Sequence, residues 1–347
     1  MDENQDKTPP QHCPQSNACS RVSYEFYGDF LYLQPNGSQL CYAVEAFPFD
    51  NAIAVPPASP NWRVFEIDPN YTPAFQVGFK TFFPTNDTNL EVNWERLHSH
   101  DSASMQVATD QDMVGPMSNI GPNSFAYAKA HGRATFHFDS SDLLFGKQIC
   151  FFDRLYMNLQ FGASFARIKQ TLNSHYEDVP GTTIRKIESP STFTGGGAKL
   201  NVDFDYQIYR GLSFTGNTSI ALLMGHLKNS QTYQSYAPAL TTQGIPQPNV
   251  QTTRVPNRTQ AIPSFEEKLG FAYAVKFNNC CELNFGIGYQ LQVFLNAIQT
   301  FDMTSPQVLP SLFTGGTVQE GVYAVGFARR FSDFILTGPY FSASLRF

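Results

Sequence analysis

A strict alternation of apolar and polar residues constrains the fold of this chain more than any other feature. The clearest case runs from Ala198 to Ile208, where the even positions are apolar and the odd positions are Lys, Asn, Asp, Asp and Gln. An α-helix, with 3.6 residues per turn, would mix these two sets around its circumference, whereas a β-strand places them on opposite faces. The segment is therefore predicted to be a β-strand with one apolar and one polar face.

The alternation recurs in long segments, most clearly in residues 155–165, 283–293, 89–95 and 133–139. Strands of globular proteins usually have about five or six residues, whereas a tilted strand that crosses a membrane needs about 9–11. A soluble β-sandwich would also alternate, but here the second face carries Asn, Gln, Gly and other small residues, as a barrel interior would. The pattern therefore favours a membrane barrel over a soluble β-fold, with the apolar face toward lipid.

The composition agrees with a sheet that has lipid on one face and water on the other. Charged residues make up 15% of the 347 residues, below the soluble norm of about 25%, while Phe and Tyr number 32 and 16. No apolar run approaches the roughly 18 residues of a membrane helix. The net charge of -6 argues against a nucleic-acid partner, which would need a basic patch.

The connections alternate between short and long, which sets the predicted topology. Short turns are expected near 84–87, 150–154, 209–211 and 278–281, on the periplasmic side, and long Pro-, Ser-, Thr-, Asn- and Gln-rich loops on the extracellular side. The long loops are 47–61, 99–122, 177–194, 231–261 and 300–333. The fold class is predicted to be all-β, a transmembrane antiparallel β-barrel with ten strands at 23–46, 62–83, 88–98, 124–147, 155–176, 195–208, 212–229, 262–277, 281–298 and 334–347.

Twelve strands are the alternative count. They would require a hairpin at Pro35-Asn36-Gly37 and an extra strand at 321–328, but would move most long loops to the periplasmic side. The domain prediction is a flexible periplasmic segment, 1–22, followed by the barrel, 23–347. Because the polar, Pro-rich start has no apolar core, a signal peptide is expected to have been removed.

The last residues carry a candidate assembly signal. Phe341, Leu345 and Phe347 share the apolar face of the final predicted strand, whose alternation continues to the last residue. A terminal aromatic ring can anchor in the membrane interface beside the carboxylate. This strand is predicted to engage the barrel-assembly machinery, with outer-membrane lipid as the other partner.

The polar faces of the predicted strands line the lumen. Their charged members are Lys80, Glu91, Glu95, Lys129, Arg133, Asp139, Lys199, Asp203, Asp205, Glu266, Lys268, Lys276, Glu282 and Arg346. Charges of both signs predict a wet interior with weak ion selectivity. The alternative is that the same residues pair across a plugged lumen and nothing crosses.

Several segments resemble the major outer-membrane protein family of Legionella and Chlamydia-related bacteria. They are Gly28–Gly37, Gln76–Lys80, Leu90–Ser99 and the ending Tyr340–Phe347, and the hairpin order between them fits as well. The resemblance spans most of the chain and implies a porin-like barrel in the outer membrane with disulfide-linked material. The stretch 300–333 departs from it, being longer and more apolar than the family's final loop.

Five of the six cysteines are predicted to face one oxidising compartment. On the ten-strand topology these disulfide candidates, in turns or in the N-terminal segment, are Cys13, Cys19, Cys150, Cys280 and Cys281. The neighbours Cys280 and Cys281 suit each other poorly because a vicinal bridge strains the backbone. Cross-links to other copies or envelope proteins are one interpretation; free thiols or local bridges are the other.

No catalytic residue, metal site or cofactor is predicted, and the protein is not expected to be an enzyme. The chain has no nucleophile elbow, and two histidines in one loop segment, His98 and His100, rarely hold a metal without further ligands. The predicted function is a porin for small polar solutes and ions. The alternatives are a structural or adhesive protein with a closed lumen, and a lipid-acting barrel enzyme.

Overall fold

The computed structural model describes residues 22–37, 40–46, 63–107, 113–115, 127–152, 154–177, 183–235, 249–278, 281–304 and 326–347. Every regular element in these ranges is a β-strand. None of the described residues forms a helix long and apolar enough to span a membrane. The predicted segment 1–22 lies outside the described residues except for its last residue.

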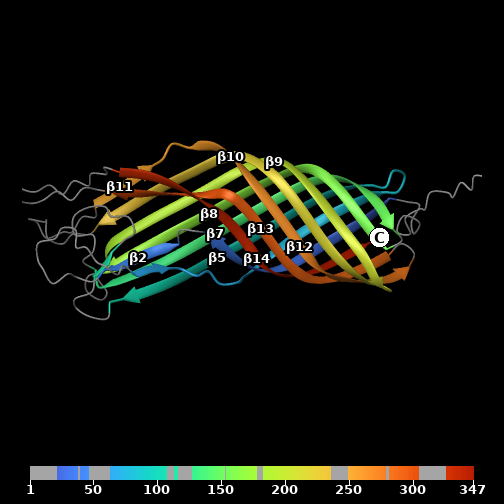
Figure 1. The fold of residues 1–347 in the computed structure, drawn as a ribbon, viewed down its shortest axis with the longest axis horizontal. Helices are drawn as coiled ribbons and strands as arrows, with labels where there is room; N and C mark the ends of the chain where they lie inside the picture. The colour runs from blue at the N-terminus through green and yellow to red at the C-terminus, as the bar shows by residue number, and fades with distance from the viewer. Residues whose placement is uncertain are drawn as a thin grey trace, which may run out of the picture.

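Ten antiparallel strands form a closed ring (Figure 1), which confirms the predicted fold class and strand number. In ring order they are β1 (Ser23–Gly37), β4 (Thr72–Phe83), β5 (Thr88–Gln106), β7 (Lys129–Phe152), β8 (Leu155–Glu177), β9 (Thr183–Tyr209), β10 (Leu212–Ser235), β12 (Arg258–Asn278), β13 (Cys281–Thr304) and β14 (Gly326–Arg346). The ring closes where β14 pairs with β1, from Glu25 opposite Arg346 to Gly37 opposite Phe334. An extra strand, β11 (Asn249–Arg254), pairs with β10 beyond the end of β12.

Six of the ten ring strands are longer than predicted, most of all β9, which was predicted at 195–208; β7 and β8 have about the predicted length, and β1 and β4 are shorter. β8 has 23 residues and β9 has 27, about twice what a membrane crossing needs. Parts of the predicted loops 99–122, 177–194, 231–261 and 300–333 are therefore strand, because their Ser, Thr and Asn side chains alternate with apolar ones that pack inside. The predicted ends of these loops were wrong.

The short turns, the start of β1 and the end of β14 all lie at the same end of the barrel, which we call the turn end. We call the opposite end the loop end. Asp87 closes one turn with a φ of 51° and Gly211 another with a φ of 79°, the left-handed conformation that tight turns require. Beside them, the backbones of Tyr24 and Phe347 exchange two hydrogen bonds of 2.8 and 2.9 Å. Figure 1 shows the C-terminus at this end.

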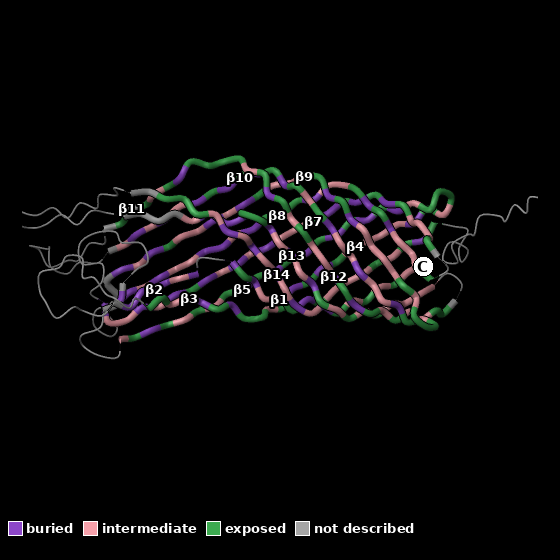
Figure 2. The backbone as a smooth tube through the Cα atoms, in the orientation of Figure 1, coloured by how far each residue is buried: buried purple, intermediate pink, exposed green. Residues whose placement is uncertain are grey.

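Near the turn end, the outer surface of the ring is an apolar belt. Large side chains such as Phe161 (63% exposed), Phe165, Met224 and Phe285 point outward from successive strands, and Phe341, Leu345 and Phe347 of the predicted assembly signal join them. Figure 2 shows the exposed positions alternating with buried ones along the strands. So much exposed apolar surface on neighbouring strands requires an apolar surrounding.

Toward the loop end, the two faces exchange character. On β8, Phe161 and Phe165 point outward, but the next large apolar residue, Ile168, is buried inside, and Arg167 and Lys169 take the outward positions. The strands here extend beyond the belt into water, where the hydrophobic effect turns apolar side chains inward. The half of the barrel at the turn end (the lower half) is thus apolar outside and polar inside, as in a membrane barrel. The half at the loop end (the upper half) is polar outside and apolar inside, as in a water-soluble protein.

A small sheet closes the loop end. It has the order β3-β2-β6 and consists of β2 (Cys41–Ala46), β3 (Arg63–Glu66) and β6 (Met113–Gly115). Tyr42 is buried over Gly132 of β7, whose missing side chain leaves room for the ring, and Tyr176 of β8 donates a hydrogen bond to the Tyr42 carbonyl. We call these three strands the cap sheet.

The cap sheet also accounts for one of the two additional strands in the twelve-strand alternative, which the ring does not contain. Pro35–Gly37 remain within β1, and β2 joins the cap sheet instead of the ring. Of the extra strand predicted at 321–328, residues 321–325 lie outside the described ranges, and Gly326–Ala328 begin β14.

Candidate functional site in the barrel lumen

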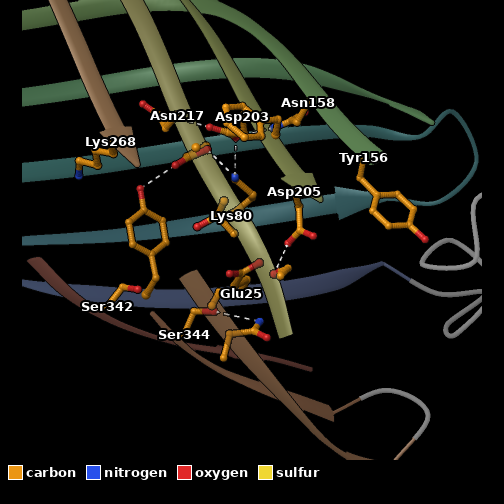
Figure 3. Close-up of a pocket in the computed structure, with 18 of the residues that line it drawn as sticks. Glu25, Lys80, Tyr156, Asn158, Asp203, Asp205, Asn217, Lys268, Ser342 and Ser344 are labelled. Atoms are coloured by element: carbon orange, nitrogen blue, oxygen red, sulfur yellow. Dashed lines mark hydrogen bonds and ion pairs between the residues drawn. The ribbon is translucent and has the colours of Figure 1, made fainter. Parts of the chain in front are cut away.

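A polar cavity of about 710 Å³ occupies the turn-end half of the lumen. Its lining includes Arg210 and Lys276. Asp203, Asn158 and Asn217, which also line it, are labelled in Figure 3. These side chains come from strands all around the ring, because the inward positions of each strand are polar at this level. The site is therefore a water-accessible vestibule with charges of both signs.

Three lysines cross-link the wall of this vestibule. Lys199 lies 2.8 Å from Asp142 and 3.0 Å from Glu266, Lys268 lies 3.4 Å from Asp29, and Lys80 lies 2.8 Å from Glu91 and 3.5 Å from Asp203. Several of these pairs join strands that are not neighbours: Lys80 on β4 and Asp203 on β9 are four positions apart in the ring. The ion pairs therefore hold opposite walls together and narrow the passage.

Neutral side chains complete the network. Gln160 donates to Glu91 over 2.7 Å and Tyr27 donates to the same carboxylate over 2.6 Å. Deeper still, Glu95 is almost fully buried and accepts a 2.8 Å hydrogen bond from Gln292 on the opposite wall. Buried charges are tolerated only when they are paired and hydrogen-bonded in this way.

Above Glu95 the lumen is filled by an apolar layer. Phe138 lies on β7 and Phe294 on β13, which are five positions apart among the ten strands of the barrel, so the two residues come from opposite walls. The centroids of their aromatic side chains are nevertheless only 5.4 Å apart. Phe334 of β14 lies 5.9 Å from Phe138 and 6.2 Å from Phe294. The same layer includes the fully buried side chains of Leu31, Leu33, Leu97, Phe136, Ile168, Phe193, Leu223, Ile262 and Leu336.

The structure brings most of the predicted lumen residues together. Those that line the vestibule are Lys80, Glu91, Lys199, Asp203, Asp205, Glu266, Lys268, Lys276, Glu282 and Arg346. Glu95 lies inside between the vestibule and the apolar layer.

Three predicted lumen residues point the wrong way. Lys129, Arg133 and Asp139 take the outward positions of β7, while Phe136 and Phe138, predicted to face lipid, are buried inside. The reason is the exchange of faces described above: this part of β7 stands in water. The same error hid Asp142, an inward partner of Lys199. Asp29, on the inward face of β1, was also missed; Phe26 and Phe30 on its other face were the available signal.

The predicted disulfide candidates are only partly described. Cys281, at the start of β13, carries a free thiol, as does Cys41 in the cap sheet. Cys150 lies near the turn-end terminus of β7, while Cys13, Cys19 and Cys280 lie outside the described residues. Cross-linking through this group stays a prediction.

A closed antiparallel ring with an exposed apolar belt and a polar interior beneath it defines a bacterial outer-membrane β-barrel. The chain belongs to the family of the Legionella pneumophila major outer membrane protein, whose sequence model matches residues 16–347. It is an outer-membrane protein, with the turn end in the periplasm and the loop end outside the cell.

Several solved structures are similar to this chain over most of its length, at low identity. The outer membrane protease OmpT from Escherichia coli matches with a TM-score of 0.42 and 9% identity, over 94% of this chain and 96% of that chain. The toluene transporter TodX of Pseudomonas putida has a TM-score of 0.29 and 8% identity, over 95% and 91%. A FadL homologue of Pseudomonas aeruginosa has a TM-score of 0.24 and 7% identity, over 94% and 90%. No curated protein sequence matches the chain.

Proposed function

We propose that this protein is a non-enzymatic structural barrel of the outer membrane whose lumen is sealed in the resting state. The single observation that carries the proposal is the contact between Phe138 and Phe294, which come from opposite walls and meet at the centre of the lumen. The extracellular half, standing in water, would then present surface to partners outside the cell, while the cysteines at the turn end would link copies or other envelope proteins on the periplasmic side.

The seal has a clear physical basis. An ion that crosses the apolar layer would lose its hydration between Phe138, Phe294 and Phe334. The buried polar side chains beside Phe136, such as Ser99 and Gln170, are neutral and would replace only a small part of that hydration. The cap sheet adds a second barrier above it. Below the layer, the vestibule communicates with the periplasm alone.

Planar-bilayer conductance tests the seal. The wild-type protein is expected to give no steady conductance, whereas the triple variant Phe138→Ala, Phe294→Ala and Phe334→Ala should conduct, because water can enter once the three rings are gone. The matched control removes three outward rings, Phe145, Phe161 and Phe165, and should stay silent. Steady conductance of the folded wild type would overturn the proposal.

Passive diffusion of small polar solutes is the second candidate function. It is favoured by the vestibule, whose volume of about 710 Å³ and mixed charges suit small solutes with weak ion selectivity. For solutes to pass, the apolar layer and the cap sheet would have to separate. The same bilayer measurement distinguishes the two functions, since only this one gives current through the unmodified barrel.

A further inference from the structure

Directly above the apolar belt, two rows of outward residues cross five adjacent strands and contain four permanent cations. The pairing register places Arg96, Asp139, Arg167, Thr194 and His226 in one row across β5, β7, β8, β9 and β10. The next row toward the loop end consists of His98, His137, Lys169, Thr192 and Lys228. We call the four permanent cations of these rows, Arg96, Arg167, Lys169 and Lys228, the basic ledge.

The ledge is open to its surroundings. Arg96, Arg167 and Lys228 are exposed and Lys169 is half-buried. One carboxylate stands in the two rows, Asp139, and it lies 3.7 Å from Arg96. Arg167, Lys169 and Lys228 have no carboxylate partner within the part of the chain that the structure describes. Three histidines, His98, His137 and His226, stand in the same two rows.

The position of the ledge relative to the belt indicates what it meets. The row immediately below consists of Trp94, Ser141, Phe165, Gly196 and Met224, whose large members are exposed and apolar. The boundary between this row and the ledge is therefore where acyl chains end and head groups begin. Because the loop end is extracellular, these are the head groups of the outer leaflet.

From this arrangement we propose that the basic ledge binds the phosphate groups of a phosphorylated glycolipid in the outer leaflet, with its acyl chains lying on the belt below. Arginine offers a planar fork of donors that matches phosphate oxygens, and each nearby cation attracts an anionic head group. The row continues onto β12 with the uncharged Thr259. The site thus occupies one side of the barrel, and it would bind lipid whether the lumen is open or sealed.

Binding of bisphosphorylated lipid A to the full chain in a non-ionic detergent tests the proposal, for example by native mass spectrometry at fixed ionic strength. The ledge variant R96Q/R167Q/K169Q/K228Q should bind at least about tenfold more weakly, because four attractive charges near the head group are lost. The matched variant K147Q/R154Q/R210Q/K276Q removes four cations at the turn end and should bind as the wild type does.

Further probes identify the ligand. Lipid A without its phosphates should bind the wild type as weakly as bisphosphorylated lipid A binds the ledge variant. Inorganic phosphate and phosphatidylglycerol should displace bisphosphorylated lipid A from the wild type only weakly. None of the mutated side chains lies in the apolar core, and all are exposed except the half-buried Lys169, so both variants should keep the wild-type β-sheet circular dichroism. Equal weakening in the two variants, or undiminished binding of phosphate-free lipid A, would show that the ledge is not a phosphate site.

Discussion

At the scale of single residues, Lys199 makes two short ion pairs in the vestibule. It joins β9 to Asp142 of β7 and Glu266 of β12, both at 3.0 Å or less, and its own side chain is 11% exposed. Removing one partner from a buried ion pair costs far more than replacing the whole group, because a charge is left without compensation. The two carboxylates would then also repel each other.

Lys199→Met is therefore expected to lower the free energy of unfolding by about 3–5 kcal/mol. Urea titration of the protein in lipid vesicles, followed by Trp fluorescence, measures this change. Lys147→Met, at an exposed position of the same barrel, is the control and should change stability by less than about 0.5 kcal/mol. Similar losses for both would show that the vestibule pairs contribute little.

Asn296 is a second residue with a specific conformational role. Its φ of 57° coincides with the break in register between Phe294 and Ile298, and its backbone N–H donates to Asp333 over 2.8 Å. Only glycine and a few polar residues take this left-handed conformation at low cost.

Asn296→Val should destabilise the barrel by about 1–3 kcal/mol because a β-branched side chain is strained at positive φ. Asn296→Gly should leave stability within about 0.5 kcal/mol of the wild type. The same urea titration gives both values, and a Val variant as stable as the Gly variant would contradict a left-handed backbone here.

At the scale of the element, each long strand has two environments along its length. On β5, Leu90, Val92 and Trp94 point outward from even positions, but Leu97 and Met105 point inward from odd positions. The apolar set therefore changes parity in the middle of the strand. This change marks the height at which the strand leaves the lipid.

The sequence contains this change of parity, but the alternation within any one short segment does not reveal it. Alternation tells which residues share a face, and it placed the vestibule residues of the lower half, such as Lys199 and Asp203, correctly. It does not tell which face is inside, so Arg133 was wrongly predicted to face the lumen and Phe138 was wrongly predicted to face lipid. The missing signal was the change of parity itself: along β7, Leu143 and Phe145 stand at odd positions, whereas Phe136 and Phe138 stand at even positions.

Tryptophan reporters on β8 should reveal the two environments. In a host with Trp62→Phe and Trp94→Phe, a Trp at Phe161 is expected to be strongly quenched by lipids brominated on their acyl chains, because that position lies in the belt. A Trp at Asn173, an outward position near the loop end, should escape quenching and respond instead to iodide in the water. Equal quenching at both positions would mean that the strand stays in lipid throughout.

At the scale of the whole molecule, the alternation of short and long connections predicted the ten-strand ring, its short turns and its common end for both termini. The strand ends and the cap sheet were not predictable, because they depend on packing between distant segments, as in Tyr42 over Gly132. The exchange of faces also fixes the height of the barrel in the membrane. Moving the barrel outward would expose part of the apolar belt to water, which costs about 25 cal/mol for each Å² of apolar surface exposed. Moving it inward would bury the charges of the basic ledge in lipid.

The seam between β1 and β14 has a consequence for how the protein is made. Tyr24 and Phe347, which exchange the outermost hydrogen bonds of that seam, are separated by nearly the entire polypeptide. The first strand therefore has an unsatisfied edge until the last one has been synthesised and delivered. During that interval the edge is open to wrong pairing and aggregation, so the first strand is protected only when the last one has been paired with it.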